Sequence, residues 1–180
     1  MIELAIVAVA LALDAAAVAA AMAAGGVAWS RLTLAAVSFG VFQALMSGIG
    51  AAGGSVMTAY AAAWDHWVAF VLLAIVGGRM VWGTGGDDDE PPSATLAVIL
   101  TASVATSIDA LAAGVSLPLL AVPAWVSVLV IGLVTAALAV GAAGLGRQVG
   151  GVLGRRAEQV AGLVLIAIGV KIVVEHTLLA

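Results

Sequence analysis

The sequence predicts an all-α polytopic membrane protein whose six transmembrane helices form two inverted three-helix repeats. The first observation is composition: 64% of the 180 residues are hydrophobic and 9% are charged, with a mean hydropathy of +1.26, whereas a soluble domain is nearer half apolar. The second observation is a series of apolar segments long enough to cross a bilayer. The third is an internal similarity between the two halves of the chain.

Six apolar segments are candidates for transmembrane helices, because each approaches or exceeds the roughly 20 residues needed to span a bilayer. They cover residues 3–25, 32–56, 64–83, 93–117, 123–145 and 157–178. Short connections rich in Gly, Pro and charged residues separate them, and the five Trp lie at or near the segment ends, as expected of an interfacial aromatic belt. The segments fill the chain and leave no room for a soluble domain.

The two halves of the chain align with each other. A shift of 92 residues places Gly40-x-x-Gln43-x-x-x-Ser47 on Gly132-x-x-Thr135-x-x-x-Ala139, and a shift of 95 residues places Asp14 on Asp109. Each unit contains three helices, and because three is an odd number the two units must cross the membrane in opposite directions. Inverted repeats of this kind are typical of secondary transporters, which bind substrate near the midplane where the halves meet.

Basic residues predict the orientation of these helices. They gather in or beside the odd-numbered connections, at Arg31, Arg79, Arg147, Arg155 and Arg156. By the positive-inside rule these connections are cytoplasmic, so both termini are predicted to face away from the cytoplasm. The predicted organisation is one membrane domain, with a first three-helix repeat at 1–86, an acidic cytoplasmic linker at 87–92 and a second three-helix repeat at 93–180.

Two aspartates interrupt the apolar segments at mid-membrane depth, Asp14 in the first segment and Asp109 in the fourth. An unpaired charge at the centre of a transmembrane helix costs at least about 2.5–3.5 kcal/mol, so such residues usually face a partner, a cavity or a transported ion. The neighbouring positions on each helix face are mostly small, which favours close helix packing. We therefore expect both acids to face the bundle interior and to lie opposite each other. The alternative is that each acid only hydrogen-bonds a neighbouring helix.

Two carboxylates near each other would suit a divalent cation. Carboxylate, carbonyl and hydroxyl oxygens favour hard ions such as magnesium, calcium and manganese, and the absence of Cys excludes thiolate metal sites and disulfides. The candidate metal ligands are Asp14, Asp109, Gln43, Ser47, Thr106 and Ser107. For Gln43, an amide bridge between two helices is an equally good interpretation. For Thr106 and Ser107, a hydrogen bond to their own helix is the commoner outcome.

Four motifs carry a resemblance to a known family. They are Ala105-Thr106-Ser107-Ile108-Asp109-Ala110, Trp64-Asp65-His66-Trp67-Val68-Ala69-Phe70, Gly77-Gly78-Arg79-Met80, and Arg156-Ala157-Glu158 running into Gly162-Leu163-Val164-Leu165-Ile166. Together they resemble the bacterial manganese efflux pump family of the MntP type, over nearly the whole chain. The resemblance implies a six-helix exporter of manganese(II) in the bacterial inner membrane, related to the lysine-exporter-like superfamily, with Asp14 and Asp109 as functional positions.

The sequence departs from that family at several positions. Family members commonly carry a hydroxyl near Ala12, another near Ala19, a Pro in place of Ser47 and Ser-Thr in place of Ala139-Val140. Their absence makes the first-half site less polar. Gln43, by resemblance, occupies a position where the family often carries Glu or Gln.

The expected function is a secondary transporter that exports manganese(II) as its substrate. Exporting a divalent ion against an inside-negative potential of 100 mV costs about 4.6 kcal/mol, and the chain has no glycine-rich phosphate loop with a Lys. We therefore expect Asp14 and Asp109 to exchange one manganese ion for two protons. The alternatives are export of another divalent cation, of a small organic cation or of an amino acid, and a membrane scaffold without transport. We expect no enzymatic activity, no bound cofactor and no nucleic acid partner.

Overall fold

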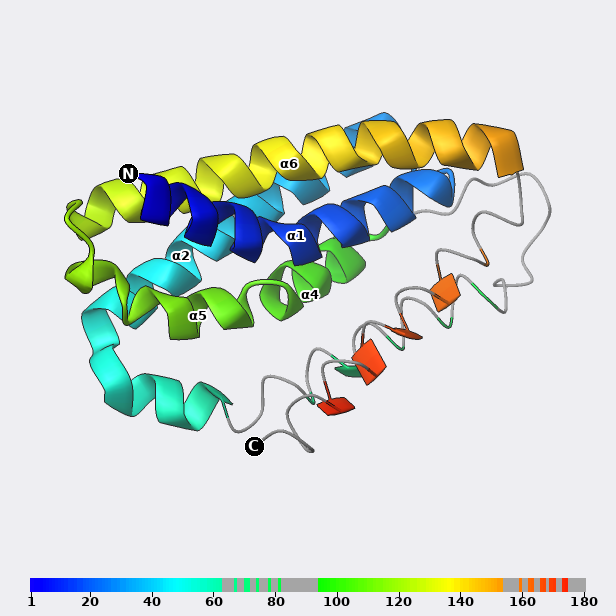
Figure 1. Ribbon diagram of the computed structural model, residues 1–180. Helices are drawn as coiled ribbons and strands as arrows, with labels where there is room; N and C mark the ends of the chain where they lie inside the picture. Colours follow the sequence, from blue (N-terminus) through cyan, green and yellow to red (C-terminus); the bar gives the residue numbers. More distant parts are fainter. Residues whose placement is uncertain are drawn as a thin grey trace.

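The computed structural model describes residues 1–62 and 94–153 without interruption, together with scattered positions among 67–81 and 159–174 (Figure 1). All the regular structure assigned to the two continuous stretches is helical. Four segments within the described residues are long and apolar enough to cross a membrane, namely Ile2–Ala24, Trp29–Gly54, Leu96–Gly114 and Ala124–Gly150. They correspond to four of the six predicted spans, which confirms a helical, membrane-type architecture.

Several predictions fall on the remainder of the chain. The predicted helices at 64–83 and 157–178 lie mostly outside the described residues, and the linker at 87–92 lies entirely outside them. The division into repeats at 1–86 and 93–180 stays a prediction for the same reason.

Helix α1 comprises Ile2–Ala24 and ends in a glycine turn. The Gly26 N–H donates to the Ala23 carbonyl at 3.1 Å and the Val27 N–H donates to the Met22 carbonyl at 3.2 Å. These two hydrogen bonds form a Schellman motif, which satisfies carbonyls at a helix C-terminus. The motif needs the left-handed φ of 84° at Gly26, which glycine adopts without steric cost.

Helix α2 comprises Trp29–Ala62 and contains one residue outside the helical conformation. Gly54 has φ of 64° and ψ of −167°, a conformation that essentially only glycine adopts. The chain changes direction there, as Figure 1 shows for the cyan part of the ribbon. The membrane-length part of α2 therefore ends at Gly54, close to the predicted end at residue 56.

The predicted helix at 93–117 is interrupted, which corrects the expectation of one continuous span. Helix α4 comprises Leu96–Ala105 and helix α5 comprises Ile108–Gly114. The α4 N-terminus is capped by the Thr95 hydroxyl, which accepts from the Val98 N–H at 3.4 Å.

At the interruption, a serine hydroxyl takes the carbonyl that a backbone amide would use. The Ser107 hydroxyl donates to the Ser103 carbonyl at 2.7 Å, which is the carbonyl that the Ser107 amide would use in a regular helix. That amide instead donates to the Val104 carbonyl at 3.2 Å. Local side-chain bonds of this kind bend or end helices. The break falls two residues before Asp109.

A short connection leads from α5 to the last described helix. The 3₁₀ turn η1 comprises Leu117–Leu119 and has Pro118 in its first turn. Proline is tolerated there because the N–H groups of a first turn have no intrahelical acceptor. Helix α6 comprises Ala124–Leu153 and follows Pro123, whose carbonyl accepts from the Val126 N–H at 2.9 Å. It continues past the predicted end at residue 145.

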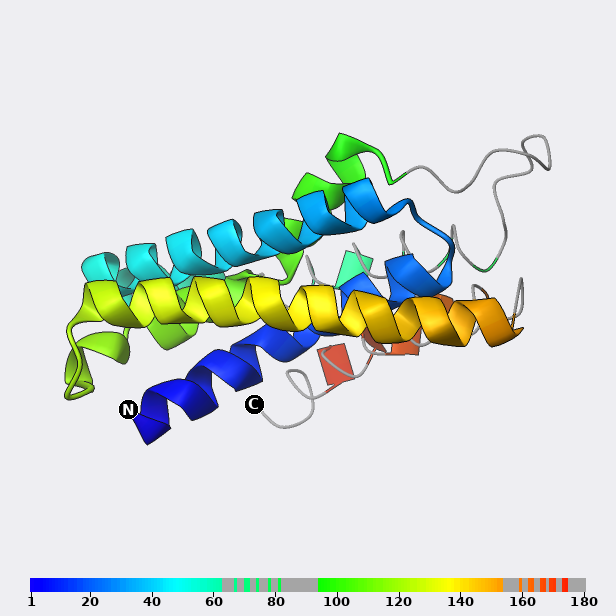
Figure 2. The same ribbon diagram turned by 90° about the horizontal axis from the view of Figure 1, so that it is seen from above.

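The helices run in two opposite directions. Figures 1 and 2 show α1 and α6 running one way, and α2, α4 and α5 running the other way. Helix α1 packs mainly against α6, α2 packs against α6, and α4 and α5 pack against α2. Each half of the chain therefore packs on helices of the other half, and the two halves interlock.

The contact between α2 and α6 is reciprocal. A Cβ atom added at Gly40 would lie 2.5 Å from the Gly132 carbonyl oxygen and 2.9 Å from the Ala136 Cβ. A Cβ atom added at Gly132 would lie 2.8 Å from the Gly40 carbonyl oxygen and 2.9 Å from the Ala44 Cβ. This exchange of partners is the pattern of an isologous contact. Glycine is needed at both positions because backbone fills the space of a side chain.

Glycines also mediate the other close helix contacts. On α6, Gly146 packs against the Ala20 carbonyl of α1, and a Cβ at Gly150 would lie 2.5 Å from the Ala24 carbonyl oxygen. Small residues at such positions allow membrane helices to approach closely enough for strong van der Waals packing.

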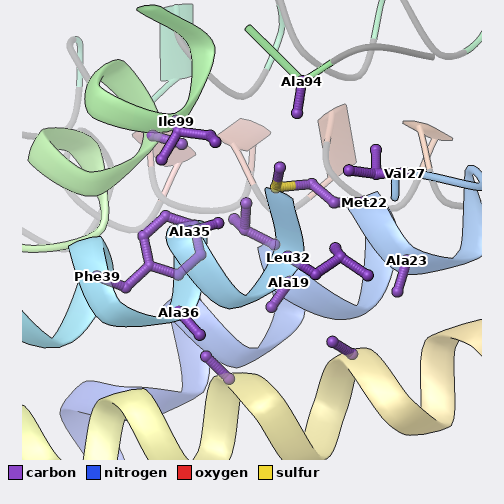
Figure 3. Close-up of a cluster of buried hydrophobic side chains, with 14 of the residues drawn as sticks. Ala19, Met22, Ala23, Val27, Leu32, Ala35, Ala36, Phe39, Ala94 and Ile99 are labelled. Atoms are coloured by element: carbon purple, nitrogen blue, oxygen red, sulfur yellow. The ribbon is translucent and has the colours of Figure 1, made fainter. Parts of the chain in front are cut away.

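Two clusters of buried apolar side chains fill the space between the helices. The first joins α1, α2, α4 and α6 around Phe39, Leu32 and Ile99 (Figure 3). The second joins Leu4, Ala8 and Leu11 of α1 to Ala110 of α5, Leu117 of η1 and Ile131 of α6. The second cluster includes Leu11 and Ala110, which are close in sequence to Asp14 and Asp109.

Candidate functional site

The two aspartates differ in how far the protein encloses them. Asp14 is exposed on α1, whereas Asp109 is half-buried on α5. Leu11 and Val18 are buried and lie about 60° and 40° around the helix from Asp14, so Asp14 lies at the edge of the buried stripe of α1. The prediction that both acids face the bundle interior stays a prediction.

Asp109 lies in the first turn of α5, directly after the break between α4 and α5. Its Oδ1 accepts a hydrogen bond from the Ala110 N–H at 2.8 Å. A carboxylate in the first turn is favoured by the helix dipole and by backbone N–H groups that lack an intrahelical acceptor. The break therefore places a partly enclosed acid at the start of a new helical segment.

Thr106 and Ser107 are buried, and both hydroxyls bond to their own helix. The Thr106 hydroxyl donates to the Ala102 carbonyl at 3.0 Å, and the Ser107 hydroxyl donates to the Ser103 carbonyl at 2.7 Å. The commoner of the two expected outcomes is thus confirmed for both residues. Each oxygen keeps lone pairs, so neither hydrogen bond prevents it from approaching a cation.

Gln43 connects α2 to α1. Its side chain is fully buried, and its Nε2 donates to the Leu11 carbonyl at 2.7 Å. The interhelical amide bridge expected as one of the two interpretations is therefore confirmed. The other half of the amide is unused, because Gln43 Oε1 is buried and accepts no hydrogen bond from the described residues. That oxygen remains available to a ligand.

Ser47 lies one turn further along α2, against α5. Its hydroxyl donates to the Ala44 carbonyl of its own helix at 3.0 Å. Its backbone carbonyl meets Gly114 of α5 so closely that a side chain at Gly114 would collide with it. Ser47 therefore marks where α2 supports the helix that carries Asp109.

These contacts bring the two acid-bearing helices onto one face of α2. Gln43 holds the α1 turn that precedes Asp14, and the Ser47 turn packs on α5. Leu11 and Ala110, which flank the two acids in sequence, belong to one core cluster. The prediction that the carboxylates of Asp14 and Asp109 lie opposite each other stays a prediction.

The chemistry available to a metal ion is correspondingly restricted. Within the two continuous stretches and the scattered described positions, no group of three or more His, Cys, Asp and Glu could hold a metal ion. Gln43 Oε1 is a neutral amide oxygen of the kind that hard cations accept as a ligand.

Sequence reasoning missed three polar residues in the bundle. The Ser38 and Ser103 hydroxyls lie 2.7 Å apart and link α2 to α4. Thr135 of α6 is fully buried, and its hydroxyl has no hydrogen-bond partner among the described residues. The alignment of Thr135 with Gln43 in the two halves was a signal that could have identified Thr135.

Comparison with known proteins identifies the family. A family described as "Putative manganese efflux pump" matches residues 26–173. A relative from Sorangium cellulosum named "Putative manganese efflux pump MntP" is 43% identical over 97% of this chain and 96% of its own length. Relatives of the same name from Syntrophotalea carbinolica and Mannheimia succiniciproducens are each 42% identical, over 78% and 83% of this chain and 77% and 82% of their own lengths.

No solved structure matches the chain. The family match covers most of the sequence, and the relative from Sorangium cellulosum aligns over 96% of its own length. The protein is therefore a member of the MntP family, a family of transporters rather than of enzymes.

Proposed function

We propose that this protein exports manganese(II) from the cytoplasm as a secondary transporter of the bacterial inner membrane. Family membership and the shared name of its relatives support manganese as the substrate. The observation that carries the proposal is the position of α2, whose Gln43 bonds to the turn before Asp14 while its Ser47 turn packs on the helix of Asp109. One helix thus organises both acid-bearing segments.

The proposed ligands combine charged and neutral oxygens. Asp14 and Asp109 supply the charge that offsets a doubly charged ion, and Gln43 Oε1 supplies a neutral oxygen. The hydroxyl oxygens of Ser47, Thr106 and Ser107 complete the set. This oxygen-only set suits manganese(II) better than zinc or copper, which favour imidazole or thiolate.

The proposed transporter is built from two inverted three-helix repeats with six spans. Two observations support this architecture. Helix α1 runs opposite to α4 and α5, and α2 runs opposite to α6, as corresponding helices of inverted repeats do (Figure 1). In addition, the reciprocal contact of Gly40 and Gly132 joins positions that differ by 92, which is the shift that aligns the halves.

The proposed orientation places the α1–α2 connection in the cytoplasm. Arg31 is exposed near the start of α2, and the Arg147 guanidinium lies 5.9 Å from the ring centroid of Trp29. Both cations are thus at the same end of the bundle, beside an interfacial Trp. An arginine-rich end of this kind is cytoplasmic by the positive-inside rule, which puts the N-terminus outside.

Proton entry is the proposed driving force. Moving two positive charges out against 100 mV costs about 4.6 kcal/mol, and the two aspartates can bind either one manganese ion or two protons. Such an exchange moves no net charge, so the membrane potential does not oppose it.

Transport by purified protein in liposomes tests the proposal. Asp14→Asn and Asp109→Asn should each abolish manganese(II) transport while leaving the protein folded, because Asn keeps the shape and removes the charge. Glu3→Gln is the matched control, since Glu3 is an exposed acid in the first turn of the same helix as Asp14. An internal pH dye should report proton movement opposite to manganese.

The outcomes separate the alternatives. Transport without opposing proton movement would exclude proton exchange. Uptake of an amino acid or organic cation that manganese(II) does not inhibit would exclude manganese as the substrate. Loss of folding in both Asn variants, without transport by the wild-type protein, would indicate a scaffold.

A further inference from the structure

Thr135 stands out among the buried hydroxyl residues of the described chain. Five others, at Ser47, Ser103, Thr106, Ser107 and Ser127, each donate to a carbonyl three or four residues earlier. This is the usual way for a mid-helix hydroxyl to be satisfied. The Thr135 hydroxyl makes no such bond although its side chain is fully buried.

Gln43 Oε1 is the second buried oxygen without a partner among those residues. The orientation of the amide is fixed, because the Leu11 carbonyl can only accept and so must face the Nε2 group. A flip of the side-chain amide would therefore not give the oxygen a hydrogen-bond donor. A buried polar atom left unpaired costs about 1–3 kcal/mol, so two such atoms in one bundle call for a partner that the described residues do not supply.

The neighbours of both residues share core clusters with the same stretch of α1. Thr135 lies one turn after Ile131, which shares a cluster with Leu11, and one turn before Ala139, which shares a cluster with Ala15. Gln43 bonds to the Leu11 carbonyl in that same stretch. The stretch from Leu11 to Ala15 contains Asp14.

The two residues also occupy related positions about the α2/α6 contact. Gln43 follows Gly40 by three residues, and Thr135 follows Gly132 by three residues. Because Gly40 and Gly132 meet reciprocally, corresponding positions lie on the same side of the contact. Gln43 and Thr135 thus approach the Asp14 turn from two different helices.

We propose that Thr135 is a ligand of the transported cation, acting with Gln43 beside the Asp14 turn. Its hydroxyl oxygen and the Gln43 amide oxygen are neutral, hard donors, which suit manganese(II) or its hydration shell. The inference rests on the proposed export function and adds a residue of α6 to the cation site.

Substitution of Thr135 by valine tests this role, because valine keeps the branched shape and removes only the hydroxyl. Isothermal titration of manganese(II) into the purified full-length protein should show a Kd raised about tenfold or more, comparable with the loss of other metal-site groups. Thr135→Ser, which restores a hydroxyl, should recover binding. Ser127→Ala is the control, since Ser127 is buried on the same helix with its hydroxyl bonded to Pro123.

A thermal unfolding measurement separates a ligand from a packing residue. Thr135→Val should unfold no earlier than the wild-type protein, because the hydroxyl has no internal partner to lose. An unchanged Kd in Thr135→Val, with wild-type export intact, would overturn the inference and leave an ordered water as the occupant. Absence of both binding and export in the wild-type protein would overturn the export proposal and this inference with it.

Discussion

Replacement of Gly40 by alanine tests the reciprocal contact between α2 and α6. The new Cβ would lie 2.5 Å from the Gly132 carbonyl oxygen and 2.9 Å from the Ala136 Cβ, whereas ordinary contacts begin at 3.4 Å. The two backbones must therefore separate by about 1 Å, and overpacking of this kind typically costs about 1–3 kcal/mol.

The matched control is Gly141→Ala on α6, where an added Cβ meets nothing within 4 Å. Both substitutions gain the helix propensity of alanine over glycine, about 1 kcal/mol. The difference between the two variants therefore isolates the cost of the collision. We expect Gly40→Ala to be about 1–3 kcal/mol less stable than Gly141→Ala.

The assay is equilibrium unfolding of the purified protein in detergent, by titration with a denaturing detergent. Gly132→Ala should behave like Gly40→Ala, because the contact is the same from both sides. Equal stability of Gly40→Ala and Gly141→Ala would refute the close approach of the two backbones.

Two further predictions use the same unfolding assay. Gly26→Ala should destabilise the protein by about 1–2 kcal/mol, because alanine is strained at the left-handed φ of 84°, whereas Gly25→Ala, at φ of −74°, should cost little; equal effects would contradict the Schellman turn. Ser103→Ala should cost about 0.6–1.7 kcal/mol by removing the hydroxyl link to Ser38. Adding Ser38→Ala to that variant should cost almost nothing more, and a full additive loss would contradict the link.

The positions of the four described spans could be predicted because they depend on the length of each apolar segment and on the glycines that end it, and both can be read from the local sequence. Gly25 and Gly26 indicated the turn after α1, whereas α2 begins at Trp29, three residues before the predicted start at residue 32. The break between α4 and α5 could not be predicted, because an apolar segment tolerates Thr106 and Ser107. Whether their hydroxyls replace a backbone hydrogen bond of the helix depends on side-chain conformation, which cannot be inferred from hydropathy.

The candidate site was predicted in its residue types more than in its contacts. The sequence placed Gln43 in mid-helix with two interpretations, and the structure uses Nε2 for a bridge and leaves Oε1 unpaired. The exposure of Asp14 could not be predicted, because small neighbours allow close packing without requiring it. The alignment of Thr135 with Gln43 pointed to Thr135, but its full burial and its unpaired hydroxyl could not be known from the sequence.

The break before Asp109 has a mechanical consequence. In an uninterrupted helix, a change in the direction of the axis stretches a backbone hydrogen bond between two residues that are four apart in sequence. Between α4 and α5 the Ser107 hydroxyl already occupies the Ser103 carbonyl, so a tilt of one segment relative to the other would not break an amide bond to that carbonyl. The half-buried carboxylate of Asp109 thus lies directly after a point where the regular backbone ladder is already interrupted.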